Sequence, residues 1–228
     1  MAKEKDNIIR YPHLIICEGL DAKLFMMYYL NFLIKQDSRY EQFQAMNAGG
    51  VAELRQFIRM LPELPNFSMV KSVIIARDAE NNACGANQSV QELLIANGFP
   101  VPSAPCIVAR PMPESQNTIT VQVKIGYILF PKLNSDETDG TLEDLCLQAL
   151  ANPNSNVVLN IVDNAIGAYQ EQLNSFKRPH KNKLHTYLSL SDDFVSLKIG
   201  ESAKANAFDY SASIFEPLSS LLAAMLQE

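Results

Sequence analysis

The chain has 228 residues, enough for one large α/β domain or for one domain with a helical extension. Its 47% hydrophobic and 19% charged content is typical of a globular protein with an ample core. The 25 acidic residues outnumber the 19 basic ones, and the net charge of −6 argues against a protein that coats DNA through charge alone. This composition does not exclude an enzyme that acts on nucleic acid, because a metal site needs acidic residues and a local basic patch can hold phosphate.

The first part of the chain alternates short apolar runs with segments of helical periodicity, which is typical of a parallel sheet under helices. We expect strands at residues 13–17, 41–47 and 71–77. The helices between them are expected at residues 22–35 and 51–61, the second ended by Pro62 and Pro65.

Two further features follow the third expected strand. The pattern Ser89-x-x-Glu92 predicts a capping box that opens the next helix. Residues 106–131 then lose the helical period, and we interpret them as a hairpin that feeds a buried strand at residues 127–130. The first strand of this hairpin is expected at residues 106–109, and the connection after it, PMPESQNT, is rich in turn residues.

The last part of the chain is expected to be mostly helical. Thr141-x-x-Asp144 predicts a capping box at the start of a short helix. Longer helices are expected at about residues 156–176, 181–190 and 211–227. The first of these shows an apolar packing stripe: Ile161, Ala165, Ala168 and Leu173.

These elements predict an α/β fold, with a parallel sheet flanked by helices and a C-terminal helical extension. We expect a boundary near residue 150, between a sheet-bearing domain (1–150) and a helical part (151–228) packed on it. The four cysteines have no CxxC or zinc spacing, so a structural zinc is not expected. The N-terminal segment does not have the pattern of a signal peptide, and no apolar stretch of about 18 residues occurs. We therefore expect a cytoplasmic protein with reduced thiols and no membrane association.

Two of the expected strands end in acidic residues. Residues 14–17 are followed by Glu18, and residues 73–77 by Asp78 and Glu80. An open α/β sheet binds its ligands at the carboxyl ends of its strands, and like charges that converge there need a cation to coexist. Asp78 and Glu80 are two positions apart, so on an extended strand end their carboxylates would point the same way. The pattern predicts a site for Mg²⁺ or Mn²⁺, and ordinary solvated acids at strand ends are the alternative.

The motif Glu18-Gly19-x-x-Asp21 after one apolar strand, with Asp78-x-Glu80 after a later one, resembles the TOPRIM domain. That domain is shared by type IA and type II topoisomerases, bacterial primases, small ribonucleases and overcoming-lysogenization-defect (OLD) nucleases. The likeness covers about residues 14–131. Over the whole chain, three further segments are similar to a family of stand-alone uncharacterised bacterial proteins of the DUF3226 type: GYILFP, GTLEDLCLQAL and KNKLHTYL.

The resemblance implies a TOPRIM-like Rossmannoid fold and roles for individual acids. Glu18 would be the family's glutamate, a metal ligand or general acid/base, and Asp78 and Glu80 the metal-binding pair. Most TOPRIM members have Asp where this chain has Glu80, whose extra methylene moves the carboxylate outward by roughly 1.5 Å. OLD nucleases hold a metal with a further acid, for which Glu143 is the candidate here. The alternative for Glu143 is capping of the helix that it opens.

The densest basic stretch, KRPHKNKLH, covers residues 177–185. A phosphate clamp that faces the acids is one interpretation, because phosphoryl transfer builds charge on the non-bridging oxygens. Lys183 is then the expected transition-state contact, with Lys181 as second choice. A solvated loop is the other interpretation, and the commoner fate of charge runs.

We therefore expect Mg²⁺-dependent phosphodiester chemistry on nucleic acid, most simply as a nuclease. No P-loop and no GxSxG motif occur. Topoisomerase and primase activities are disfavoured, because the chain has neither a second domain to present a tyrosine to DNA nor a zinc-binding domain. One alternative is a catalytically weak TOPRIM-like subunit that binds or regulates a protein partner. A receiver-like phosphoacceptor with Asp78 modified ranks last, because only Glu18 closes the first strand.

Overall fold

A four-stranded parallel sheet forms the centre of the protein in the computed structural model, which describes residues 8–111, 121–173 and 176–227. The strands are β1 (His13–Cys17), β2 (Phe43–Asn47), β3 (Ser72–Asp78) and β4 (Lys124–Phe130). They lie in the order β2-β1-β3-β4, and every neighbouring pair is parallel. The carboxyl ends of the four strands therefore share one edge of the sheet, which positions the candidate site.

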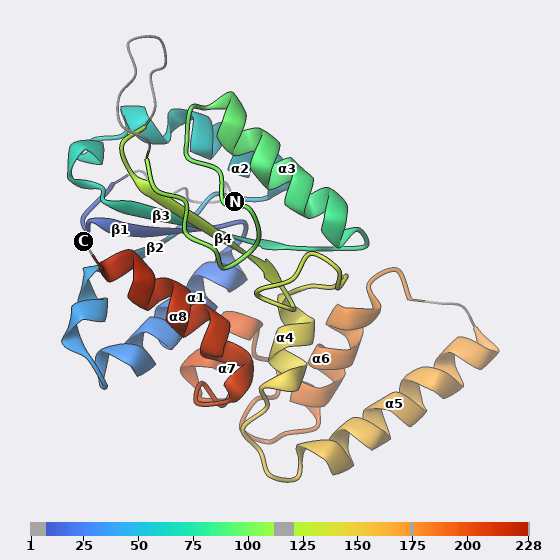
Figure 1. Cartoon of the computed structure of the whole chain (residues 1–228). Helices are drawn as coiled ribbons and strands as arrows, with labels where there is room; N and C mark the ends of the chain where they lie inside the picture. The colour runs from blue at the N-terminus through green and yellow to red at the C-terminus, as the bar shows by residue number, and fades with distance from the viewer. Residues whose placement is uncertain (1–7, 112–120, 174–175, 228) are drawn as a thin grey trace.

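Helices cover both faces of the sheet (Figure 1). They are α1 (Leu20–Ile34), α2 (Val51–Met60), α3 (Ala83–Ala96), α4 (Leu142–Gln148), α5 (Ser155–Gln172), α6 (Pro179–Ser189), α7 (Ile199–Lys204) and α8 (Glu216–Leu226). Helices α2 and α3 lie on one face, and α1, α7 and α8 lie on the other. The expected fold class, an α/β sheet flanked by helices, is confirmed.

Burial on both faces explains why the strands are continuous apolar runs. In β1, Leu14 and Ile16 belong to the core under α2 and α3, whereas Ile15 and Cys17 face the opposite core. Each fully buried aliphatic side chain of this kind contributes about 1.5–3 kcal/mol to the stability of the fold. The broad apolar surface of α1 is covered by the sheet and also by α7, where a Cβ on Gly200 would lie 2.4 Å from Leu24 Cδ1.

Two expectations for the segment between β3 and β4 are wrong. The helix predicted to open at Ser89 begins at Ala83, because Asn82 accepts a hydrogen bond from the Gly85 N–H and Asp139 accepts one from the Ala83 N–H. Residues 106–109 form no strand. Cys106 has a left-handed backbone (φ 60°), and only an isolated antiparallel bridge joins Ala109 to Ile125.

The predicted turn-rich connection lies, from residue 112 on, outside the described residues. The capping box of Thr141 and Asp144 at the start of α4 is confirmed. The short helix α7 was not predicted.

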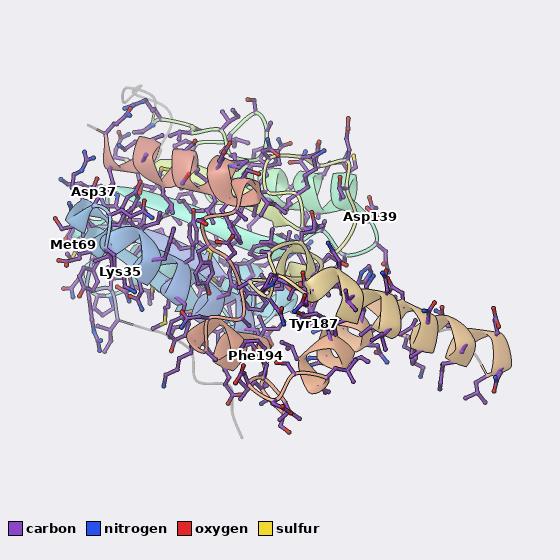
Figure 2. The ribbon with its side chains drawn as sticks, turned by 90° about the horizontal axis from the view of Figure 1, so that it is seen from below. Lys35, Asp37, Met69, Asp139, Tyr187 and Phe194 are labelled. Carbon is purple, nitrogen blue, oxygen red and sulfur yellow. The ribbon has the colours of Figure 1, made fainter. Side chains whose placement is uncertain are left out.

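The apolar stripe predicted for α5 is wrong. Ile161 and Leu173 are 55% and 62% exposed, and Val162 is the buried residue of the helix. Helix α5 packs on α6 and extends away from the sheet (Figures 1 and 2), so most of its surface faces solvent. None of the described helices combines the length and the apolar character that crossing a bilayer requires.

Buried residues of the C-terminal helices and of the sheet belong to one core. Leu221 and Met225 of α8 cluster with Ile74 and Ile128 of the central strands. The C-terminal helices therefore pack on the sheet, and the division into two domains at residue 150 stays a prediction.

Candidate metal centre

Three carboxylates meet at the carboxyl edge of the sheet. Glu18 follows β1, Asp78 is the last residue of β3, and Glu80 stands two positions later. One oxygen of each lies within 4.8 Å of an oxygen of the others. The parallel pairing of β1 with β3 causes this meeting, since Cys17, the last residue of β1, is the register partner of Ala76, two residues before the end of β3.

Glu18 carries a buried carboxylate oxygen that lacks a hydrogen bond from the described residues. Its side chain is 14% exposed, and its Oε2 atom accepts no hydrogen bond from the described residues. Burial raises the pKa of Glu18, while the guanidinium of Arg77, with Nε 3.9 Å from Oε2, opposes that rise. A buried acceptor without a partner costs about 1–3 kcal/mol, so this oxygen favours a proton or a cation beside it.

Asp78 has a carboxyl group with a strongly raised pKa. Burial and the neighbouring charge of Glu18 raise its pKa to about 8, although the Leu142 N–H donates a hydrogen bond of 2.9 Å to Oδ1. Asp78 therefore also caps the first turn of α4, which ties that helix to the end of β3. The raised pKa means that a cation at this carboxylate would compete with a proton.

Glu80 reaches the cluster by a different backbone route from the one expected. The strand ends at Asp78, and Glu80 has a left-handed backbone with φ 56°. Its N–H and C=O both bond to Gly140, at 2.7 Å each. The expectation that an extended strand end aligns the two carboxylates is therefore wrong in its reason, although the three acids still converge. The Glu80 side chain is exposed, so it lies on the solvent side of the cluster.

Glu143 lies beside this cluster and has a cationic partner. It is buried in the first turn of α4, and Lys181 Nζ lies 3.1 Å from its Oε1. Its charge also contributes to the raised pKa of Asp78. Partial burial acts to lower the pKa of Lys181, but Glu143 more than offsets this and the net shift is upward. Lys181 therefore stands as a cation beside the acids.

The two candidate lysines of the basic stretch at residues 177–185 contact different acidic residues. Lys181 joins Glu143, whereas Lys183 Nζ lies 2.7 Å from Asp163 on α5. Residues two apart on a helix do not share a face, which explains the separation. His180 Nδ1 lies 2.6 Å from Asp144 Oδ1, so this turn of α6 is anchored to α4. Lys181 is the better placed of the two lysines for a phosphate at the acids.

Arg77 belongs to the candidate site, and the sequence reasoning missed it. Its side chain is 11% exposed and lies beside Glu18, and its Nε donates a 3.4 Å hydrogen bond to the Asp78 carbonyl. The available signal was a cation within an otherwise apolar strand, next to an acid. A guanidinium at this position keeps part of the negative charge compensated before any metal arrives.

The donor set fits a hard divalent cation. It offers three carboxylates from two strand ends, one of them with a buried oxygen that accepts no hydrogen bond from the described residues. Mg²⁺ and Mn²⁺ bind oxygen donors, and Mg²⁺ keeps several waters, so two or three carboxylates are sufficient.

Comparison with known proteins gives one family match and one structural likeness. The family model described as "Protein of unknown function (DUF3226)" matches residues 12–227. No curated protein matches the chain. Among solved structures, the C-terminal region of the Xanthomonas campestris pv. campestris OLD protein is similar over 96% of this chain and 97% of that one, with 14% identity and a TM-score of 0.45. Both values are low, so this chain's own residues must support any function assigned to it.

Proposed function

The chain belongs to the DUF3226 family of proteins of unknown function, and we propose that it performs Mg²⁺- or Mn²⁺-dependent phosphodiester chemistry on nucleic acid, most simply cleavage. The observation that carries the proposal is the convergence of Glu18, Asp78 and Glu80 around a buried oxygen that accepts no hydrogen bond from the described residues. Acids with raised pKa values at the ligand-binding edge of an α/β sheet are typical of functional sites. The resemblance of the acidic motifs to TOPRIM domains supports the choice of reaction.

The three acids would hold the ion, and Glu143 is the candidate for holding a second one. A bound ion would activate water and stabilise the leaving oxygen of a phosphodiester. Glu18 is the candidate general acid/base, because burial raises its pKa and makes its carboxylate a stronger proton acceptor. The guanidinium of Arg77 would orient the Glu18 carboxylate and compensate part of its negative charge.

Lys181 is the proposed contact for the phosphate. Its ammonium group lies at Glu143, beside the acids, where it would offset charge on the non-bridging oxygens. Lys183 is held by Asp163 and would act at most from the margin of the site.

A cytoplasmic location is part of the proposal, and the four free cysteines fit a reducing compartment.

The test is cleavage of labelled single- and double-stranded DNA and RNA with Mg²⁺, with Mn²⁺ and with chelator. We expect metal-dependent cleavage that Glu18→Gln abolishes. Glu92→Gln is the matched control, because Glu92 is an exposed acid on α3. Cleavage that persists in chelator, or a Glu18→Gln variant as active as wild type, would exclude this mechanism.

Glu80 favours a second candidate, a TOPRIM-like module that binds metal and a protein partner without turnover. Its exposed side chain and left-handed backbone differ from the strand-end aspartate that most TOPRIM members carry. Metal binding by calorimetry without cleavage of any nucleic acid would favour this module, and Glu80→Asp would then be the variant to assay for gain of cleavage.

A further inference from the structure

We propose that the opposite, amino edge of the sheet carries a second site, which binds a small phosphate- or carboxylate-bearing anion between Lys71, Arg110 and His13. A cavity of about 640 Å³ opens there, and its lining includes these three residues, Gln122 and Lys124. That volume lies within the range of small-molecule sites. The site is independent of the metal centre proposed above.

The strand register builds one wall of this cavity. His13 is paired with Ser72, and Ser72 with Lys124, so the first residues of three neighbouring strands form one row. His13 is buried, and its Nδ1 lies 2.8 Å from Ser72 Oγ. Because the row belongs to the sheet, its polar groups are held in place before any ligand binds.

The charge of the lining points to an anion. Lys71, Arg110, Lys124 and His13 line the cavity, and no acidic side chain is among the described residues that do so, although the whole chain has a net charge of −6. Burial is the main cause that lowers the pKa of His13 to about 4, and the charges of Lys124 and Lys71 lower it further, so both lysines lie close enough to act on this imidazole. Arginine and lysine together are the usual ligands of phosphate and carboxylate groups.

A purely structural role explains only part of this cluster. Lys124 Nζ donates a hydrogen bond of 2.9 Å to the Met225 carbonyl, so it caps the C-terminal end of α8. Lys71 has no such role: its side chain is exposed, and within the described part of the chain it forms no ion pair and no side-chain hydrogen bond. The packing of α8 therefore accounts for Lys124 but not for Lys71.

The two sites are too far apart to hold the same phosphate. Strand β3 runs from Ser72 at this cavity to Asp78 at the acids, and at about 3.3 Å per residue its ends lie roughly 20 Å apart. In Figure 2, Met69, just before β3, and Asp139, which follows β4, are labelled on opposite sides of the sheet.

The experiment is calorimetric titration of the metal-free protein, in chelator, with phosphate, pyrophosphate, adenosine monophosphate and citrate. We expect at least one of these to bind with a Kd of about 1 mM or lower. Lys71→Ala and Arg110→Ala should each weaken binding about tenfold, whereas Lys132→Ala, an exposed lysine at the carboxyl edge, should not. Phosphate compounds binding without citrate would identify a phosphate site, and citrate binding alone a carboxylate site.

A second readout needs no variant. The chain has three histidines, and only His13 lines the cavity, whereas His180 and His185 lie on α6. Ligand should shift the imidazole NMR signals of His13 and raise its pKa, with those of His180 and His185 unmoved. Absence of binding at about 10 mM ligand, equal binding by all three variants, or shifts at His180 in place of His13 would each overturn the proposal. None of these results depends on metal or cleavage, so they leave the nuclease proposal untouched.

Discussion

At the carboxyl edge of the sheet, Glu18 follows strand β1 and Asp78 ends strand β3; at the amino edge, the same two strands begin with His13 and Ser72. Burial raises the pKa of Asp78 to about 8 and lowers that of His13 to about 4. The two shifts have opposite sign and the same main cause, since burial disfavours the charged form of either group, and neighbouring like charges add to each shift. The ligands that we propose for the two edges differ accordingly: a cation at the acids, and an anion at the cluster around Lys71.

The largest expected effect is on metal affinity at the carboxyl edge. Asp78→Asn should lower Mg²⁺ or Mn²⁺ affinity at least about 100-fold, because it removes a charged ligand while the amide oxygen can still accept from the Leu142 N–H. Calorimetry of the folded variant measures this. Asp192→Asn, at an exposed acid, is the control, and unchanged affinity in Asp78→Asn would remove Asp78 from the site.

The same substitution should stabilise the metal-free protein. The raised pKa means that the folded state binds more protons than the unfolded state between pH 3.8 and about 8, so the free energy of unfolding falls as pH rises through that range. Asp78→Asn should remove this fall and raise the free energy of unfolding by about 1–3 kcal/mol at pH 8, or about 2–4 °C in Tm for each kcal/mol. Thermal unfolding in chelator from pH 4 to 8 checks the difference, which should vanish toward pH 4.

A smaller effect should separate the two lysines of the basic stretch. Lys181→Ala should lower cleavage about tenfold, since its ammonium group lies beside the acids. Lys183→Ala should change cleavage less, because Lys183 pairs with Asp163 on α5. Both variants should keep the salt dependence of oligonucleotide binding that phosphate contacts produce. If Lys183→Ala lowered the cleavage rate more than Lys181→Ala, Lys183 would be the phosphate contact in place of Lys181.

The smallest effect is expected at the amino edge. With its pKa lowered to about 4, His13 binds fewer protons in the folded state than in the unfolded state between about pH 4 and 6.5. The free energy of unfolding should therefore rise with pH over that range, opposite in sign to the effect of Asp78. His13→Gln should flatten this rise. Thermal unfolding of wild type and variant at matched pH values measures it, and an unchanged slope would mean that His13 does not titrate as described.

Local chemistry and apolar patterning were sufficient to predict the sheet and the acids. The strands are buried on both faces, so their apolar runs can be recognised without knowing their neighbours. The carboxyl ends of parallel strands share an edge, which is why Glu18 and Asp78 could be placed together before the structure. The Thr141–Asp144 capping box at α4 was predictable because its two partners are only three positions apart in the sequence.

Contacts between distant segments decided the rest. Helix α3 begins at Ala83 partly because Asp139 accepts from its first N–H, and no pattern near Ser89 contains that information. Whether Lys181 or Lys183 reaches the acids depends on how α6 sits against α4 and α5. The cationic cavity depends on strand register, which pairs His13 with Ser72 across 59 positions of sequence. Sequence determines which residues can be buried or charged, but only the packing of the chain determines which of them meet.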